Sequence, residues 1–339
     1  MTGAIKAWAG RRNTRILGVG AYRPRTALTN ADILKHLDSS DEWIRRRSGV
    51  VTRHRADRQE TLAYMAVEAG KGALKSAGIT ADDVDLIIVA TATRMRQIPH
   101  VSPEIAFKIG AGTTAAFDVS AGCAGFVYGL NIAHSSVTSG SARNVLVIGV
   151  ERLLDVTDPT DRGTAFLMGD GAGAVVVGVS DAPAIGPVIW GSDGSRSDLL
   201  QQSVAWDELR ESYEKGKPEQ PWPSLRMQGR EVFRWAVWQM ADVAREALDT
   251  AGVSVAELDA FIPHQANMRI TDSLVKELKL PERVVVARDV SDTGNTSAAS
   301  IPLAMEKLLS SGQVSSGATA LMIGFGAGLS YAGVVARLP

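Results

Sequence analysis

The apolar positions of this chain repeat at a fixed spacing. Residues 73–85 read ALKSAGITADDVD, and residues 247–259, which lie 174 positions later, read ALDTAGVSVAELD. In each copy Ala and Leu recur at helical spacing up to a glycine, Gly78 or Gly252. Glycine often follows the last turn of a helix because it adopts the left-handed conformation at little cost. We therefore predict two equivalent helices that end at these glycines.

An apolar run follows each of these helices after a short turn. Residues 86–93 read LIIVATAT and residues 260–267 read AFIPHQAN, and both patterns predict buried strands. A second pair of runs, NVLVIGVER and TALMIGFGA, aligns Gly149 with Gly324 at a spacing of 175 residues. Two segment pairs at nearly the same spacing predict an internal duplication, in which two similar α/β halves pack around a pseudo-twofold axis.

The same spacing brings three polar loops together. It places Cys123 opposite position 297, within the stretch DTGNTSAAS, and it places His264 opposite Ala90 at the end of the matching strand. We expect the loops around Cys123, His264 and Asn295 to meet where the two halves contact each other.

Composition narrows the possible functions. Of the 339 residues, 45% are hydrophobic and 22% are charged, which is typical of a globular protein with a substantial core. Lys plus Arg number 36 and Asp plus Glu 37, so no overall field favours nucleic acid or an anionic membrane. One cysteine cannot form an internal disulfide, and the amino-terminal stretch shows no secretion signal. The longest weakly polar run, residues 321–336, is too short to span a bilayer, so we predict a cytoplasmic protein with neither membrane nor nucleic-acid partner.

Cys123 is a candidate nucleophile. The residues after it, AGFVYGLNIAHSSVTSG, predict a helix that begins just behind the thiol. A helix amino terminus favours thiolate over thiol, so we expect a lowered pKa for Cys123. Gly122 and Gly125 allow a sharp strand-to-helix turn and the close approach of a substrate. Taken alone, a single cysteine is more often a small buried hydrophobe, so the context decides between the two interpretations.

His264 and Asn295 are candidate partners of this thiol. His264 follows a predicted strand, and no second histidine, cysteine or carboxylate lies nearby at metal-ligand spacing, which argues against a zinc site. Asn295 stands between a glycine and small hydroxyl residues. The alternatives are a structural histidine and an asparagine that caps a turn.

Two glycine-rich stretches do not fit a dinucleotide site. GVGAYRP runs into Pro24 rather than into a helix, and GDGAGA has the wrong spacing and precedes the strand-like VVVGV. We therefore expect no nicotinamide cofactor.

Six segments, in order along the chain, carry a resemblance to a known family: SSDEWIRRRSG, DVSAGCAGF, DPTDRGTAFLMGDGAGA, FIPHQAN, DTGNTSAASIP and GFGAGLSYAG. From about Ile16 onward the chain resembles 3-oxoacyl-[acyl-carrier-protein] synthase III, the initiating condensing enzyme of type II fatty acid synthesis in the thiolase superfamily, and it looks most like the actinobacterial branch. The resemblance implies a thiolase-like, duplicated αβαβα layered fold of the α/β class. Its first half, 12–180, would carry the nucleophilic cysteine, and its second half, 181–339, the histidine and the asparagine.

The implied reaction is a decarboxylative Claisen condensation. An acetyl or short branched acyl group passes from acyl-CoA to Cys123, and malonyl-ACP then loses CO₂ and attacks the acyl-cysteine to give 3-oxoacyl-ACP. The resemblance assigns catalysis to Cys123, His264 and Asn295, and it places an oxyanion between the backbone N–H groups of Cys123 and Ala327. Many family members have glycine at the position of Ala327, and a positive φ there would strain an alanine. The resemblance implies neither a cofactor nor a metal, and it implies a homodimer.

The resemblance also implies binding residues. Those expected to bind CoA are Trp43, Arg47, Arg162, Phe233, Asn267 and Arg269. Trp43 and Arg162 would sandwich the adenine, the other two arginines would meet phosphates, and the remaining pair would line the pantetheine arm. Those expected to contact the acidic acyl carrier protein are Arg234, Gln265, Arg269 and Lys276. Ile98 corresponds to a residue that closes the acyl pocket across the dimer, and its size favours branched or longer primers beside acetyl.

Four other functions stay open at this stage. A priming ketosynthase III of a type II polyketide pathway would use the same three catalytic residues. An acyltransferase to an oxygen or nitrogen acceptor would not need Asn295, because decarboxylation is the step that most needs this donor. A non-catalytic partner subunit would not need the nucleophile, and a Cys-dependent hydrolase would need a base that activates water.

Overall fold

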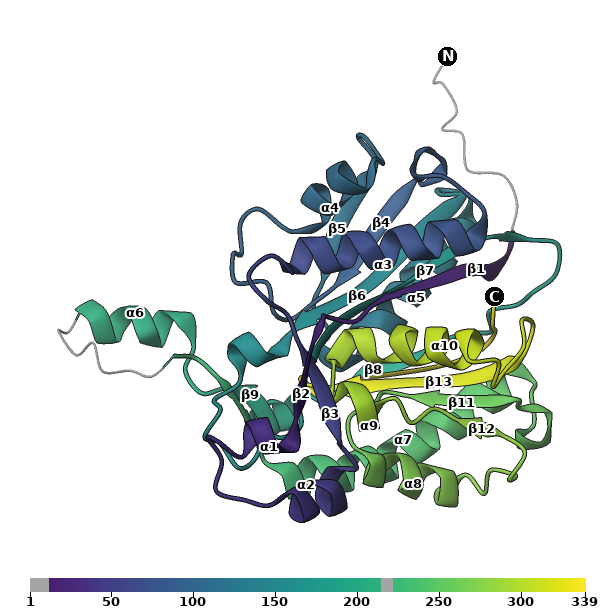
Figure 1. Cartoon of the computed structure of the whole chain (residues 1–339). Helices are drawn as coiled ribbons and strands as arrows, with labels where there is room; N and C mark the ends of the chain where they lie inside the picture. Colours follow the sequence, from purple (N-terminus) through teal and green to yellow (C-terminus); the bar gives the residue numbers. More distant parts are fainter. Residues whose placement is uncertain (1–11, 215–221) are drawn as a thin grey trace.

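Two five-stranded mixed sheets form the centre of the protein (Figure 1). The computed structural model describes residues 12–214 and 222–339, so the first part of the amino-terminal stretch, for which no secretion signal is expected, lies outside the described residues. In spatial order the first sheet consists of β1 (Asn13–Tyr22), β7 (Asp170–Ser180), β6 (Asn144–Arg152), β4 (Leu86–Ala90) and β5 (Ala115–Val119). The second consists of β8 (Ile189–Ser192), β14 (Ser330–Arg337), β13 (Thr319–Gly326), β11 (Ala260–Pro263) and β12 (Val285–Val286).

The two sheets repeat one pattern of strand directions. In the first sheet β1, β7 and β6 pair antiparallel, whereas β6, β4 and β5 pair parallel. In the second sheet β8, β14 and β13 pair antiparallel, whereas β13, β11 and β12 pair parallel. The segments that the sequence repeat aligns, β4 with β11 and β6 with β13, occupy equivalent places in the two sheets. The predicted duplication is therefore confirmed.

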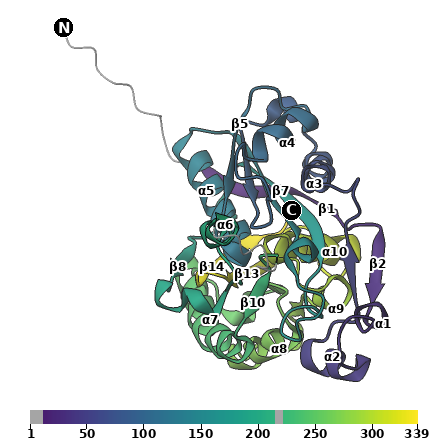
Figure 2. The ribbon, with the colours of Figure 1, turned by 90° about the vertical axis from the view of Figure 1, so that its left-hand side faces the viewer.

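Helices cover both outer faces of this pair of sheets. α3 (Leu62–Ala77) and α4 (Ser102–Ile109) pack on the first sheet, and α7 (Gly229–Ala251) and α8 (Met268–Glu277) pack on the second. Figure 2 shows the same arrangement from the side, with α3 and α4 at the upper right, beside the first sheet, and α7 and α8 at the bottom of the view. As predicted, α3 and α7 end at left-handed glycines, with φ values of 69° and 66°.

Two further helices lie between the sheets and complete five layers. α5 (Gly125–Ser139) follows the short 3₁₀ turn η2 (Gly122–Ala124), and α10 (Ser300–Ser310) follows the equivalent turn η6 (Ser297–Ala299). Apolar side chains of both helices join one core with side chains of both sheets. The helix predicted behind the thiol is thus confirmed, and the layered thiolase-like fold with it.

Successive side chains of the central strands point to opposite faces of each sheet, and both faces are buried. In β6 Val147 faces the core between the sheets, whereas Leu146 faces the core under α3 and α4. In β13 Met322 faces the central core and Leu321 the core under α7 and α8. All four side chains have no exposed surface. A strand whose two faces are both buried has a continuous run of apolar residues, and the sequences of β6 and β13 show this pattern.

The glycines that the repeat aligned allow the two halves to approach closely. A Cβ on Gly149 would lie 2.2 Å from the carbonyl oxygen of Ala298 in η6. A Cβ on Gly324 would lie 3.0 Å from the Cα of Ala124 in η2. Each central strand therefore needs glycine where the 3₁₀ turn of the other half crosses it, and this contact positions both turns at the junction.

The remaining elements connect or flank the strands and helices of the five layers. They are β2 (Thr26–Thr29), α1 (Asn30–Ile33), α2 (Asp41–Ser48), β3 (Thr52–Arg55), β9 (Leu200–Gln202), α6 (Trp206–Glu214), β10 (Leu225–Met227) and α9 (Val290–Thr293), with the 3₁₀ turns η1 (Ala81–Asp83), η3 (Leu153–Val156), η4 (Gly194–Leu199) and η5 (Val255–Glu257). Figure 1 shows α6 projecting from the body of the protein.

Candidate active site

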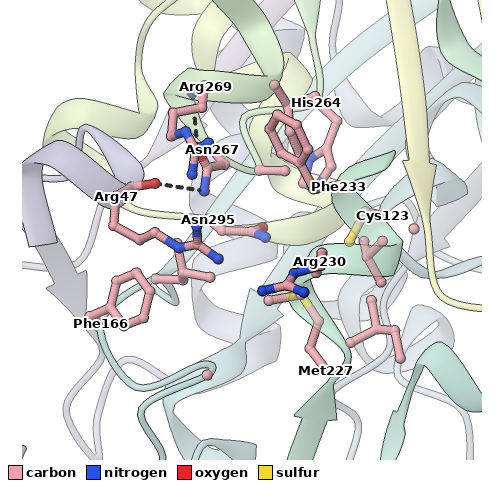
Figure 3. Close-up of a pocket in the computed structure, with 18 of the residues that line it drawn as sticks. Arg47, Cys123, Phe166, Met227, Arg230, Phe233, His264, Asn267, Arg269 and Asn295 are labelled. Carbon is pink, nitrogen blue, oxygen red and sulfur yellow. Dashed lines mark hydrogen bonds between the residues drawn. The ribbon is translucent and has the colours of Figure 1, made fainter. Parts of the chain in front are cut away.

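A pocket of about 400 Å³ is lined by residues of both halves (Figure 3). Nine residues that the sequence singles out line it: Trp43, Arg47, Cys123, Arg162, Phe233, His264, Asn267, Arg269 and Asn295. His264 and Asn295 are buried and Cys123 is half-buried, whereas the three arginines are exposed. The pocket therefore has a buried end at the cysteine and a cationic mouth.

The turn after β5 places Cys123 at the buried end. Gly122 has a φ of 52°, a conformation that favours glycine. A Cβ on Gly122 would lie 3.1 Å from the backbone nitrogen of Ala327, so the glycine leaves room for that residue. A Cβ on Gly326 would lie 2.8 Å from the Cys123 nitrogen and 2.9 Å from its sulfur. The loop after β13 thus lies directly against the cysteine, and the small residues around the thiol serve this close approach.

The pKa of Cys123 differs from the sequence-based expectation. Burial raises it to about 12, ionised Glu151 also raises it, and the neighbouring Ser297 side chain lowers it. The expectation of a lowered pKa was therefore wrong for this state of the protein. The surrounding loops remove water from the sulfur, and in this setting the loss of hydration outweighs a favourable helix terminus.

His264 is a buried histidine whose imidazole is neutral. It lies just after β11, is 2% exposed, and has its ring 5.1 Å from that of Phe325 in a T-shaped arrangement. Burial lowers its pKa to about 3, so the imidazole carries no charge at neutral pH.

Ser300 orients the His264 ring. Its Oγ lies 2.7 Å from His264 Nδ1 and accepts the backbone N–H of Gln265 at 3.3 Å. A Ser300 hydroxyl that donates to Nδ1 leaves the ring proton of the neutral imidazole on Nε2. The Nε2–H group is then available to a substrate oxygen.

Ser300→Ala is expected to slow condensation about tenfold, because loss of one buried hydrogen bond frees both the ring and the tautomer. The rate of condensation from preformed acyl-enzyme should be measured beside that of Ser310→Ala, a variant at the other end of the same helix. Equal rates for the wild type and Ser300→Ala would contradict this role.

The backbone fixes Asn295 at the same end of the pocket. Its N–H donates to the Leu167 carbonyl at 2.7 Å, and its own carbonyl accepts from Gly169 at 2.9 Å. Its side-chain Oδ1 accepts the backbone N–H of Ser297 at 2.8 Å. With the oxygen engaged in this way, the Nδ2 group is the part of the side chain that can donate to a ligand.

Ala327 does not adopt the conformation that would strain it. Among the residues that the structure describes, Lys279 and Ser297 are the non-glycine residues with positive φ. The possible strain at Ala327 is therefore absent, and an alanine is compatible with this loop.

Aromatic and cationic groups pair at the mouth. The Arg162 guanidinium lies 5.7 Å from the centre of the Trp43 ring, and that of Arg269 lies 5.1 Å from the Phe233 ring. Asn267 caps α8 by accepting the Arg269 N–H at 2.9 Å. Its Nδ2 donates to the backbone of α2 at 3.3 Å, which joins the two sides of the mouth (Figure 3).

Two arginines at the pocket are absent from the sequence-based set. Arg230 lines the pocket, and Arg46 joins Trp43, Arg47 and Arg269 around a smaller cavity beside it. Arg46 lies within the segment SSDEWIRRRSG, so its neighbours offered a signal, whereas nothing in the local sequence of Arg230 distinguishes it from a surface arginine.

Four residues singled out from the sequence do not line the pocket. Gln265 is fully buried, and its amide bonds the Pro263 carbonyl at 2.7 Å, so the expected contact to a carrier protein was wrong. Arg234 and Lys276 are exposed. Ile98 is 86% exposed and does not line the pocket of its own chain.

The structure offers neither a metal site nor a membrane span within its described ranges. No group of three or more potential metal ligands occurs in residues 12–214 and 222–339. None of the helices in these ranges is both long and apolar enough to cross a bilayer.

Duplicated αβαβα halves with cysteine, histidine and asparagine at one pocket define a condensing enzyme of the thiolase class. Comparisons agree: residues 117–194 match the family model for 3-oxoacyl-[acyl-carrier-protein (ACP)] synthase III, and residues 248–338 match the model for its C-terminal part. The chain belongs to the β-ketoacyl-[acyl-carrier-protein] synthase III family, as the sequence motifs indicated, and is an acyltransferase of fatty acid synthesis.

Individual relatives match over nearly the whole chain. A β-ketoacyl-[acyl-carrier-protein] synthase III of Streptomyces glaucescens is 59% identical over 99% of both chains, and a mycobacterial one of Mycobacterium avium is 48% identical over 99% of this chain and 98% of its own. The crystal structure of the priming β-ketosynthase of the R1128 polyketide pathway has a TM-score of 0.94 at 49% identity, covering 99% of both chains. That of the Aquifex aeolicus synthase III has a TM-score of 0.87 at 41% identity, covering 96% of this chain and all of its own.

Proposed function

We propose that this pocket joins an acyl-CoA primer to malonyl-ACP with loss of CO₂. The observation that carries the proposal is the single pocket in which Cys123, His264 and Asn295 share walls with aromatic and cationic groups suited to CoA. Each half of the chain contributes different catalytic residues: residues 12–180 contribute the nucleophile, and 181–339 contribute the two side-chain donors.

In the first step the Cys123 sulfur attacks the thioester carbon of acyl-CoA. The negative charge that develops on the carbonyl oxygen is held by the backbone N–H groups of Cys123 and Ala327, whose loops lie against each other at Gly122 and Gly326. Breakage of the carbon–sulfur bond to CoA leaves an acyl-cysteine and releases CoA.

In the second step the malonyl group loses CO₂. The electron pair that remains moves onto the malonyl thioester oxygen, where His264 Nε2–H and Asn295 Nδ2–H donate to it. The resulting carbanion attacks the acyl-cysteine carbonyl and forms the new carbon–carbon bond. Cys123 leaves as a thiolate, which takes up a proton from solvent and becomes a thiol again. A neutral histidine suits this step, because it donates without first having to be protonated.

The mouth binds CoA in this proposal. Trp43 and Arg162 would hold the adenine between their flat faces, which requires the guanidinium to move away from its position 5.7 Å from the Trp43 ring, while Phe233 and Asn267 would line the path of the pantetheine arm. Arg47 and Arg269 meet phosphates, and Arg46 adds a third guanidinium beside the same cavity.

Arg47→Ala is expected to raise the KM for acyl-CoA about tenfold and to leave kcat within about twofold, because a charge-assisted bond to a phosphate is lost far from the reacting atoms. Arg45→Ala is the matched control, since Arg45 lies on the same helix, pairs with Asp41 at 2.7 Å and does not line the pocket. Steady-state rates over a range of acyl-CoA concentrations test this, and an unchanged KM for Arg47→Ala would contradict the assignment.

Partners follow from the same arrangement. Arg234, Arg269 and Lys276 are exposed, and in this proposal they are the cations that contact an acidic acyl carrier protein. A homodimer would bring Ile98 of one subunit to the acyl pocket of the other, which accounts for an isoleucine that is 86% exposed in the single chain. A reactive thiol that must stay reduced supports a cytoplasmic location for the reaction.

A polyketide-priming role is the second candidate, and the likeness to the R1128 priming ketosynthase favours it. A panel of acetyl-, isobutyryl- and longer acyl-CoAs, each tested with malonyl groups on a fatty acid and on a polyketide carrier protein, separates the two. Faster condensation on the fatty acid carrier supports the main proposal, and condensation confined to the polyketide carrier assigns the second role. Acylation of Cys123 that persists with both carriers would point to an oxygen or nitrogen acceptor.

A further inference from the structure

Glu151 is a buried carboxyl next to the catalytic cysteine. It lies near the end of β6 and has no exposed surface. Its oxygens accept hydrogen bonds from Thr93 Oγ1 at 2.6 Å, from the Ala92 N–H at 3.1 and 3.2 Å, and from Thr91 Oγ1 at 3.3 Å. Ser297 Oγ donates to its Oε1 at 3.0 Å.

No cation balances this carboxyl. Within residues 12–214 and 222–339 Glu151 takes part in no ion pair, and the adjacent Arg152 pairs with Asp155 at 2.7 Å instead. Burial raises the pKa of Glu151 to about 7, against the effect of its neutral donors. Such a group changes between its carboxyl and carboxylate forms near neutral pH, which suits it to exchange a proton.

Ser297 connects this carboxyl to both catalytic side chains. Its hydroxyl donates to Glu151 Oε1 at 3.0 Å and lies beside the Cys123 thiol, while its backbone N–H donates to Asn295 Oδ1 at 2.8 Å. Its φ of 48° is rare for a residue other than glycine. Strained backbone of this kind persists where the surrounding structure holds it, and it is enriched at active sites.

The thiol has no other evident base among the described residues of the pocket. His264 is neutral, and its Nδ1 is engaged by Ser300 at 2.7 Å. The remaining titratable side chains of the pocket are arginines, which do not accept protons. A thiol whose ionisation is opposed by burial needs an acceptor for its proton as it attacks.

We propose that Glu151 accepts the proton of Cys123 through the Ser297 hydroxyl during acyl transfer, a role that rests on the proposed function of the pocket. As sulfur bonds to the thioester carbon, the thiol proton passes to the Ser297 oxygen and the Ser297 proton passes to Glu151 Oε1. When the bond to CoA breaks, the CoA thiolate takes up a proton by the reverse route. CoA then leaves as a thiol, and Glu151 is again a carboxylate.

Glu151 is surrounded by neutral donors and one titratable group, so its ionisation should appear in the pH dependence of the acylation rate. Cys123 from η2 is the titratable group on the pocket side; Thr91, Ala92 and Thr93 beyond β4 and Ser297 in η6 present neutral donors. The rate of acylation should therefore rise with pH through about 7, where Glu151 ionises, and level off above it.

The test compares Glu151→Gln with the wild type in single-turnover acylation by acetyl-CoA between pH 5.5 and 9.5. We expect Glu151→Gln to acylate about 100-fold more slowly at pH 7, a typical loss for a general base. We also expect its rate to climb steadily with pH, without the step near 7, so that the deficit shrinks in alkali. A rate within threefold of the wild type, or a loss that is the same at every pH, would overturn the proposal.

Two further variants separate proton transfer from structure. Ser297→Ala removes the hydroxyl but keeps the backbone N–H that donates to Asn295 Oδ1, so it should lose the step near pH 7 in the acylation profile. It also decides the matter if Glu151→Gln does not fold. Asp170→Asn is the control for a buried carboxyl outside the pocket, held by the N–H groups of Ala56 and Leu154, and its profile should match the wild type. A Ser297→Ala profile that keeps the step would overturn the proposal.

Alkylation of Cys123 by iodoacetamide keeps this test independent of the proposed substrates. The wild type should be alkylated with a step near pH 7 that Glu151→Gln lacks. If no acyl-CoA acylates Cys123 but this difference appears, the proton route stands and the assigned substrates fail. If acyl-CoA acylates the protein but alkylation and acylation profiles agree between the two proteins, the substrates stand and the proton route fails.

Discussion

Cys123→Ala is expected to abolish acyl transfer, lowering turnover with acyl-CoA and malonyl-ACP by more than about 1,000-fold. The covalent step needs a sulfur at the buried end of the pocket, and the chain contains no second cysteine that could replace it. The acyl adduct seen by mass spectrometry on the wild-type protein should vanish together with turnover.

Two controls sharpen this result. Binding of CoA, followed by calorimetry, should change little in Cys123→Ala, because the mouth residues lie away from the sulfur. The thermal midpoint should stay near that of the wild type, because the side chain is half-buried and small. An acyl adduct on another residue, or turnover above about 1% of the wild type, would contradict the role of Cys123.

Asn295→Ala is expected to separate the two steps of the reaction. Condensation should fall about 100- to 1,000-fold, because one of two donors to the developing enolate oxygen is lost. Acylation of Cys123 should stay within about threefold, because that step uses the backbone donors near Ala327 instead. Single-turnover acylation and the decay of acyl-enzyme after addition of malonyl-ACP measure the two rates separately.

Asn295→Asp is the informative companion variant. It keeps the oxygen that accepts the Ser297 N–H at 2.8 Å, so the loop should hold its shape. It replaces the Nδ2 donor by a second oxygen, so condensation should fall as far as in Asn295→Ala. Condensation by Asn295→Asp within tenfold of the wild type would show that shape rather than donation matters at this position.

Much of the fold follows from the sequence because it depends on local patterns. Gly149 and Gly324 could be aligned as a repeat, and each allows a turn of the other half to cross its strand. The pocket residues Trp43 and Arg162 were found because they lie within motifs, and the structure places their side chains against each other.

Other features depend on contacts between distant segments, which a local pattern does not show. The pKa of Cys123 is set by how far the loops after β13 and around Ser297 exclude water, so the helix behind the thiol was a poor guide. Gln265 follows His264 directly, yet its amide turns inward to the backbone. Glu151 and Ser297 are 146 residues apart, and only the packing of β6 against η6 brings them together.

The most direct test of the central claim is whether an acyl-enzyme on Cys123 is consumed as product forms. Protein loaded with a radiolabelled acyl group and freed of CoA is mixed with malonyl-ACP, and label on the Cys123 peptide and on 3-oxoacyl-ACP is followed in time. The account predicts that label leaves Cys123 at the rate at which 3-oxoacyl-ACP and CO₂ appear, and no more slowly than steady-state turnover. Label that remains on Cys123 while product accumulates, or product formed without a labelled cysteine, would contradict it.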